Sequence, residues 1–236
     1  MQDSKTIPFI STQPQFEKQD FLFQDWGLID YEKALSQQLQ LVEKVADENL
    51  RGVLVFCTHP PVVTLGRATK VAEDLQGWRG ATVEVSRGGR ATYHGPSQLV
   101  IYPIINLNYA TNHRPAKDIG IYLRNFEQAI VSTLAEFGIF AQGKTYQKKS
   151  EHDAETDETG VWIGANKIAS LGIAVKRWVT YHGAAVNLEY DPQAFQGLRP
   201  CGFSPQVMTC VETQIQKPVN RAQFQSIMQE KLNQAL

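Results

Sequence analysis

The order of strand-like and helical patterns in this sequence predicts an α+β fold, in which helices pack on a mixed or antiparallel β-sheet. Strand-like segments come in clusters, and three of them follow one another between residues 161 and 188. Helical patterns are few and long. The regular alternation of strand and helix that is typical of a doubly wound parallel sheet is absent.

Apolar residues that recur every three or four positions predict three helices. The first spans residues 31–49, with Asp30 as its N-cap. The second begins after Asp118 and stops at Gly138, because glycine readily adopts the left-handed conformation that ends helices. The third lies near the C-terminus and is marked by Phe224, Ile227, Met228 and Leu232.

Short runs rich in β-branched and aromatic residues, bounded by glycine, proline or polar residues, predict the strands. They span residues 21–26, 52–58, 62–65, 82–85, 99–105, 161–163, 167–175 and 178–188. The run at 52–58 is almost entirely apolar, which indicates a buried strand, and Pro60 and Pro61 follow it.

Composition and charge favour one soluble domain in the cytoplasm. We expect a polar N-terminal extension over residues 1–20, a single domain over residues 21–236, and a charged surface loop over residues 147–158. No signal peptide or membrane-spanning run is predicted. A net charge of −1 gives no general attraction for nucleic acid or membranes. The three cysteines favour neither a disulfide framework nor a zinc site, so no bound metal is expected.

The most distinctive segment spans residues 87–103 and reads RGGRATYHGPSQLVIYP. Glycines allow the backbone to approach a ligand closely, and here they lie beside an apolar strand, which predicts the floor of a binding cleft. Arg87 and Arg90 can bind phosphate or carboxylate groups as forked donors, or can form a solvated loop edge. His94 and His182 can act as general bases or as structural histidines.

One of the three cysteines is a candidate nucleophile. Cys57 and Cys210 lie in strand-like surroundings, where a cysteine usually serves as a small hydrophobic residue. Cys201 lies between Pro200 and Gly202, which indicates a turn. The local context alone leaves a reactive thiol and an ordinary loop thiol equally open.

Lys167 favours the reactive alternative for Cys201. It is the only charged residue in the apolar run 162–173, although a solvent-facing strand lysine is the simpler interpretation. An ammonium group beside a thiol favours the nucleophilic thiolate. A lysine can also give a proton to a leaving thiol and take one from an incoming amine, so the pair suits acyl transfer from a thioester to an amine. His59, His113 and His152 are predicted to lie on surface loops.

Several segments, in the same order along the chain, resemble the motifs of the octanoyltransferases of lipoate synthesis. They are residues 58–66, 87–103, 160–172, 178–187 and 200–202. The resemblance runs from about residue 22 to the end of the chain. It implies the fold shared by lipoate and biotin protein ligases, a catalytic lysine at Lys167 and an acyl-thioester cysteine at Cys201. It also implies substrate contacts at Arg87, Gly88, Gly89, Arg90, Ala91, Thr92, Tyr93, His94, Ser170, Leu171, Gly172, Gly183, Ala184 and Ala185.

The resemblance implies a two-step reaction without a cofactor. The cysteine takes an octanoyl group from the phosphopantetheine arm of acyl carrier protein. It then passes the group to a lysine on a lipoyl domain of a 2-oxoacid dehydrogenase complex or on the glycine cleavage H protein. No nucleic acid or membrane partner is expected.

Two departures from the family pattern and three rival functions remain open. Ser97 stands where the family usually has glycine, and the charged stretch 147–158 is longer than usual. Neither departure involves the candidate cysteine or lysine. The rivals are an ATP-dependent lipoate or biotin ligase, an amidotransferase that moves octanoyl between carrier domains, and a non-catalytic module that binds acylated carrier proteins.

Overall fold

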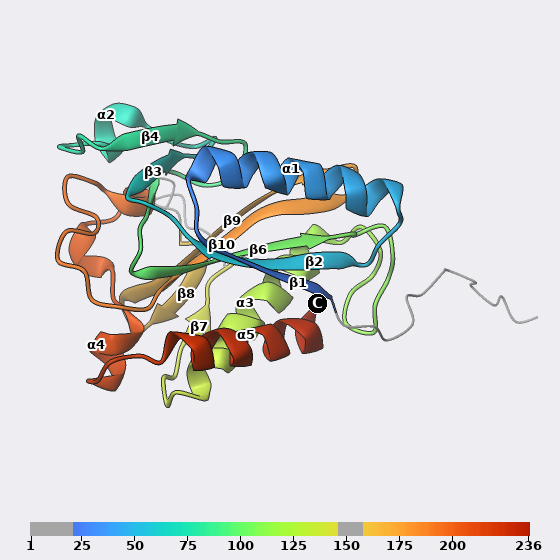
Figure 1. The fold of residues 1–236 in the computed structure, drawn as a ribbon. Helices are drawn as coiled ribbons and strands as arrows, with labels where there is room; N and C mark the ends of the chain where they lie inside the picture. The colour runs from blue at the N-terminus through green and yellow to red at the C-terminus, as the bar shows by residue number, and fades with distance from the viewer. Residues whose placement is uncertain (1–20, 146–157) are drawn as a thin grey trace, which may run out of the picture.

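A seven-stranded sheet runs through the centre of the computed structural model, which describes residues 21–145 and 158–236 (Figure 1). The strands follow the order β1 (Leu22–Leu28), β2 (Gly52–Thr58), β6 (Gln98–Ile105), β10 (Val179–Asn187), β9 (Asn166–Lys176), β8 (Gly160–Ile163) and β7 (Gln142–Gly143). Only β1 and β2 pair in parallel; the other neighbours in this sheet are antiparallel. The predicted α+β fold with a mixed sheet is confirmed.

Helices cover both faces of this sheet (Figure 1). Helix α1 (Tyr31–Asp47) packs on one face, where its apolar side joins a core cluster with residues of β2, β6 and β10. Helices α3 (Ile119–Ala135) and α5 (Arg221–Ala235) pack together on the opposite face over the larger core cluster. The predicted N-caps are confirmed, because the carboxylates of Asp30 and Asp118 accept hydrogen bonds from first-turn N–H groups.

A second, three-stranded sheet lies on the same side of the large sheet as α1. It has the order β4 (Ala81–Glu84), β3 (Val62–Leu65) and β5 (Thr92–His94), and the short helix α2 (Val71–Asp74) lies beside it (Figure 1). Strand β5 is the centre of the glycine-rich motif, and the chain passes from it directly into β6. The motif therefore joins the small sheet to the large one, which fixes its position over the central strands.

Two predictions about single residues are wrong. His59 was expected at the surface because prolines follow it, but its ring is completely buried between the sheets. There Nδ1–H donates to the carbonyl of Ile29 and Nε2 accepts from the Tyr102 hydroxyl, both at 2.7 Å. Cys210 was expected in a strand, but it precedes the short helix α4 (Val211–Ile215).

Two other predictions about single residues are confirmed. Cys57 is buried in β2, and His113 is exposed. The N-terminal extension, His152 and nearly all of the charged stretch 147–158 lie outside the described residues. Within the described ranges, no helix is long and apolar enough to span a bilayer, and no three histidine, cysteine or acidic side chains are grouped to hold a metal ion.

Candidate active site

A pocket of about 390 Å³ lies between the two sheets, on the α1 side of the large one. Three neighbouring strands form its floor, where Ser170 of β9 pairs with Ala185 of β10, which in turn pairs with Val100 of β6. Two residues further along β9, Gly172 pairs with Gly183 of β10. Small side chains in these two rows leave room above the sheet. Leu171 and Ala184 border the pocket from within the strands, because their side chains join the core cluster on the opposite face.

The glycine-rich motif closes the pocket from above. The N–H of Gly88 donates to the carbonyl of Ile173 at 3.1 Å, which ties the motif to β9. A Cβ atom on Gly172 would lie only 3.0 Å from the carbonyl oxygen of Gly88. Glycine at position 172 therefore allows the close approach of the two backbones.

Arg87 brings a buried positive charge to the pocket wall. Its Nη1 donates to the carbonyls of Gly88 and Arg90, and its Nη2 donates to the carbonyl and hydroxyl of Thr64. Within the described ranges, its Nε has no hydrogen-bond partner and no carboxylate forms an ion pair with it. The guanidinium is thus held by neutral oxygens, and its charge acts on the groups that line the pocket.

The second arginine of the motif has a different environment. Arg90 pairs with the buried carboxylate of Asp74 at 2.6 Å and with Glu73 at 3.0 Å, which anchors the motif to α2. Tyr93 packs edge-on against Phe195 and Trp78 in the core of the small sheet. These contacts hold the motif in place from outside the pocket lining.

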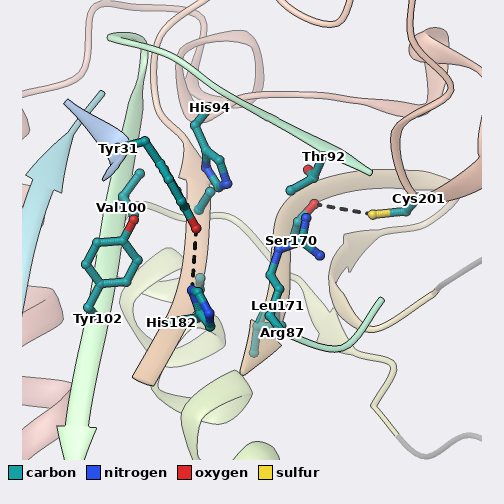
Figure 2. A pocket seen from close by; sticks show the side chains of 14 residues that line it. Tyr31, Arg87, Thr92, His94, Val100, Tyr102, Ser170, Leu171, His182 and Cys201 are labelled. Atoms are coloured by element: carbon teal, nitrogen blue, oxygen red, sulfur yellow. Dashed lines mark hydrogen bonds between the residues drawn. The ribbon is translucent and has the colours of Figure 1, made fainter. Parts of the chain in front are cut away.

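Cys201 lies in a 3₁₀ turn, η2 (Pro200–Gly202), as its neighbours predicted. Its N–H donates to the carbonyl of Ala91 at 2.9 Å, so the turn is fastened to the glycine-rich motif. Its φ of +56° is in the left-handed region, which is strained for a residue other than glycine. This conformation directs Sγ into the pocket, 4.0 Å from the hydroxyl of Ser170 (Figure 2).

A β-bulge sets the direction of Lys167. In the β8–β9 pair, Val161 lies opposite Ala169, but the next residue, Trp162, lies opposite Lys167, so β9 contains one extra residue, Ile168. Ile168 and Ala169 both enter the core cluster on the far face. The side-chain alternation is therefore shifted by one, and Lys167 falls on the same face as Ser170.

The lysine side chain is completely buried. Its Nζ lies 5.5 Å from the ring centroid of Trp162 and 5.8 Å from that of Phe203, two residues beyond Cys201. A Cβ atom on Gly160 would lie 2.7 Å from its Cε, and Gly160 pairs directly with Ser170. The ammonium group thus lies beside the turn that carries the cysteine, and the solvent-facing alternative for Lys167 is wrong.

Four side chains form what we call the polar wall, on the side of the pocket away from Cys201 (Figure 2). They are Tyr31, His94, Tyr102 and His182. The Tyr31 hydroxyl lies 3.4 Å from His182 Nδ1, and its ring stacks on His94 at 5.5 Å. The Thr64 hydroxyl accepts from Arg87 and lies 3.2 Å from His94 Nε2.

Burial keeps the polar wall uncharged. Desolvation, together with the positive charge of Arg87, lowers the pKa of His182 to about 3. Desolvation also holds the pKa of His94 well below its usual value, with His59 and Arg87 adding to the effect. The pKa of Tyr31 is raised to about 12, chiefly by burial. At neutral pH the wall therefore consists of neutral imidazole and phenol groups.

The pocket brings together most of the residues that the sequence indicated. Those in its lining are Arg87, Thr92, His94, Ser170, Leu171, Gly172, Gly183, Ala184, Ala185 and Cys201. Gly88, Gly89, Arg90, Ala91 and Tyr93 support it from outside the lining. Ser97 lies elsewhere, in the wall of a separate depression of about 1310 Å³.

Four lining residues were not among the expected substrate contacts: Tyr31, Val100, Tyr102 and His182. Val100 and Tyr102 alternate along the strand that follows the motif, a signal that places them on one face. Tyr31 carries no such signal, because it begins a helix and reaches the pocket only through the tertiary fold.

Comparison with known proteins gives a consistent family assignment. Residues 30–233 match the family described as the lipoyl protein ligase A/B catalytic domain. An octanoyltransferase of Bdellovibrio bacteriovorus is 51% identical over 92% of this chain and 99% of its own length.

Two solved structures share the fold. A lipoate-protein ligase A bound with ATP has a TM-score of 0.62 and 14% identity, over 92% of this chain and 84% of that one. A bipartite lipoate protein ligase from Thermoplasma acidophilum, described with its E2 lipoyl domain, has a TM-score of 0.57 and 15% identity, over 92% and 83%. Together with the family match and the close relative, these likenesses lead to one conclusion: the chain belongs to the octanoyltransferases, acyltransferases of lipoate synthesis that share the lipoate protein ligase fold.

Proposed function

We propose that this protein moves an octanoyl group from the phosphopantetheine thioester of acyl carrier protein to a lysine of a lipoyl domain, through a thioester on Cys201. The observation that carries the proposal is the position of Cys201 Sγ, which lines an apolar pocket beside Ser170 while a buried ammonium group lies next to the same turn. Family membership supports the octanoyl group as the cargo.

In the first step, the Cys201 thiolate attacks the carbonyl carbon of the incoming thioester. The bond between that carbon and the pantetheine sulfur breaks, and the leaving sulfur takes a proton from the Lys167 ammonium. The octanoyl chain then lies in the pocket as a thioester on Cys201, and Lys167 is neutral.

In the second step, the neutral amine of Lys167 removes a proton from the ammonium group of the acceptor lysine. The resulting amine attacks the acyl carbon, the bond to Cys201 Sγ breaks, and an amide forms while the second amine proton leaves to solvent. Lys167 is again an ammonium and Cys201 a thiolate, so the pair is ready for another cycle. The donor arrives as an activated thioester, so we propose that no cofactor is needed.

The remaining contacts have supporting roles in this proposal. The motif 87–94 holds the acyl chain from above, with Arg87, Thr92 and His94 in the lining and its other residues fixing their positions. Ser170, Leu171 and Gly172 with Gly183, Ala184 and Ala185 form the floor. We further propose that the lipoyl domains of 2-oxoacid dehydrogenase complexes and the glycine cleavage H protein are the acceptors, and that the reaction takes place in the cytoplasm.

The ATP-dependent ligases are the nearest alternative, because their solved structures share this fold. An ATP-dependent ligase needs no nucleophilic thiol in the pocket. The strained turn that directs Cys201 toward Ser170 favours the covalent route, since a strained conformation persists only where the surrounding structure enforces it.

Intact mass of the protein after mixing with octanoyl acyl carrier protein tests the covalent step. We expect a gain of one octanoyl group in the wild type and in Cys210→Ser, and no gain in Cys201→Ala. Cys210 is the matched control, because it is equally buried and lies outside the pocket. Equal labelling of Cys201→Ala and the wild type, or transfer that depends strictly on ATP, would overturn the proposal.

A further inference from the structure

We propose that the Tyr31 side chain is the end wall of the acyl pocket and sets the longest chain that the protein accepts. This inference rests on the proposed function, because it assigns Cys201 as the point from which the chain is measured. It adds a specificity-determining residue that the sequence motifs do not contain, since Tyr31 lies 56 positions before the first residue of the glycine-rich motif.

The pocket has two chemically different ends (Figure 2). Cys201, Ser170 and Thr92 lie together at one end, and the polar wall lies at the other. The floor consists of Val100, Ala185 and the two paired glycines. An acyl chain attached to Cys201 therefore runs over an apolar floor until its terminal methyl group meets the Tyr31 ring.

The Tyr31 ring is held on several sides and cannot move aside easily. It stacks on His94 at 5.5 Å, packs against His59 at 5.0 Å, and its hydroxyl contacts His182 at 3.4 Å. The position of His182 is fixed in turn, because its backbone N–H donates to the side-chain oxygen of Gln38 in α1 at 2.8 Å. A chain that displaced Tyr31 would leave buried polar groups without partners and would gain only apolar contact, so the wall opposes longer chains.

Competition between acyl carrier proteins that carry octanoyl and dodecanoyl groups tests the end wall. Both substrates are mixed with one sample of protein, and the two acyl–enzyme species are counted by intact mass at early times. Because the ratio is taken within a single sample, it does not depend on the fraction of protein that is folded. We expect Tyr31→Ala to raise the dodecanoyl to octanoyl ratio at least about tenfold, the discrimination typical of space for extra methylene groups.

Two further variants test whether the effect comes from loss of the Tyr31 ring itself. Tyr31→Phe keeps the ring and should leave the ratio close to that of the wild type. Tyr190→Ala removes an exposed tyrosine outside the pocket and should do the same. An unchanged dodecanoyl to octanoyl ratio in Tyr31→Ala, or an equal rise in Tyr190→Ala, would overturn the proposal that Tyr31 is the end wall. Absence of any acyl–enzyme in the wild type would instead overturn the proposed function, so the two failures are distinguishable.

Discussion

The complete burial of Lys167 is easier to explain by a role in the reaction than by a role in stability. A completely buried ammonium group is costly unless its surroundings favour the charge, and two aromatic faces within 6 Å supply part of that stabilisation. If this charge favours the Cys201 thiolate, Lys167→Ala should slow alkylation of Cys201 by iodoacetamide at pH 7 by about tenfold or more. The measurement is the modification rate of the peptide that contains Cys201, read by mass spectrometry.

Lys176→Ala is the matched control for that prediction. Lys176 lies on the same strand, but it is about half exposed and pairs with Glu43 on the surface. Its removal should leave the alkylation rate unchanged. A rate in Lys167→Ala equal to that of the control would remove the role of Lys167 in activating the thiol, although it would leave a role in proton transfer untouched.

The β8–β9 bulge places the lysine through the geometry of two strands. Gly160 has a φ of +144°, and a Cβ atom there would lie 2.2 Å from the carbonyl oxygen of Ala169 and 2.7 Å from Lys167 Cε. Gly160→Ala should therefore displace the lysine stem and reduce octanoyl transfer by about tenfold or more, beyond any loss of stability. Transfer per folded molecule is the measurement, with folding followed by circular dichroism.

Gly164→Ala provides the comparison at the other end of β8. Gly164 also has a positive φ, +56°, but apart from its two chain neighbours no described residue has an atom within 4 Å of its Cβ position. The substitution should cost about 1–2 kcal/mol of stability from backbone strain alone and leave transfer per folded molecule unchanged. Equal transfer by the two variants would show that crowding at Gly160 does not position Lys167.

The same elements explain what could be predicted from the sequence. The long helices and most strands were predictable because hydrophobic periodicity extends over many residues, and Cys201 and Lys167 stood out as polar groups in turn-forming and apolar surroundings. Strand β5 and helix α2 were too short for a periodic signal. The direction of Lys167 depends on a bulge, which strand alternation read from the sequence does not reveal.

Tyr31 and His59 illustrate a second limit. Tyr31 begins the first predicted helix, but its contact with the pocket arises only when the small sheet folds over the large one. His59 looked like a surface residue because two prolines follow it, yet its ring bonds to a carbonyl 30 positions away. Contacts between distant segments leave no local pattern, so these roles could not be found from the sequence.

At the scale of the whole molecule, closing one sheet over the other buries three histidines in their neutral form. Burial is the largest cause of the lowered pKa for each of His59, His94 and His182. In the unfolded chain a histidine has a pKa near 6.5. On acidification the unfolded state therefore binds more protons than the folded state, in which these histidines have lower pKa values. Folding stability contributed by these groups is therefore present at and above neutral pH, and it is lost as the pH falls below about 6.5.

His182 allows this pH dependence to be tested quantitatively. Its pKa of about 3 when folded means that acidification from pH 7.5 to 5.5 should cost the wild type about 1.4 kcal/mol of unfolding free energy through this residue. His182→Gln should remove that share of the pH dependence, as measured by urea unfolding at both pH values. His113→Gln, at an exposed position, should keep all of it. The same loss on acidification in His182→Gln and the wild type would mean that the histidine takes up a proton in the folded protein, and the polar wall would then carry charge at the end of the acyl pocket.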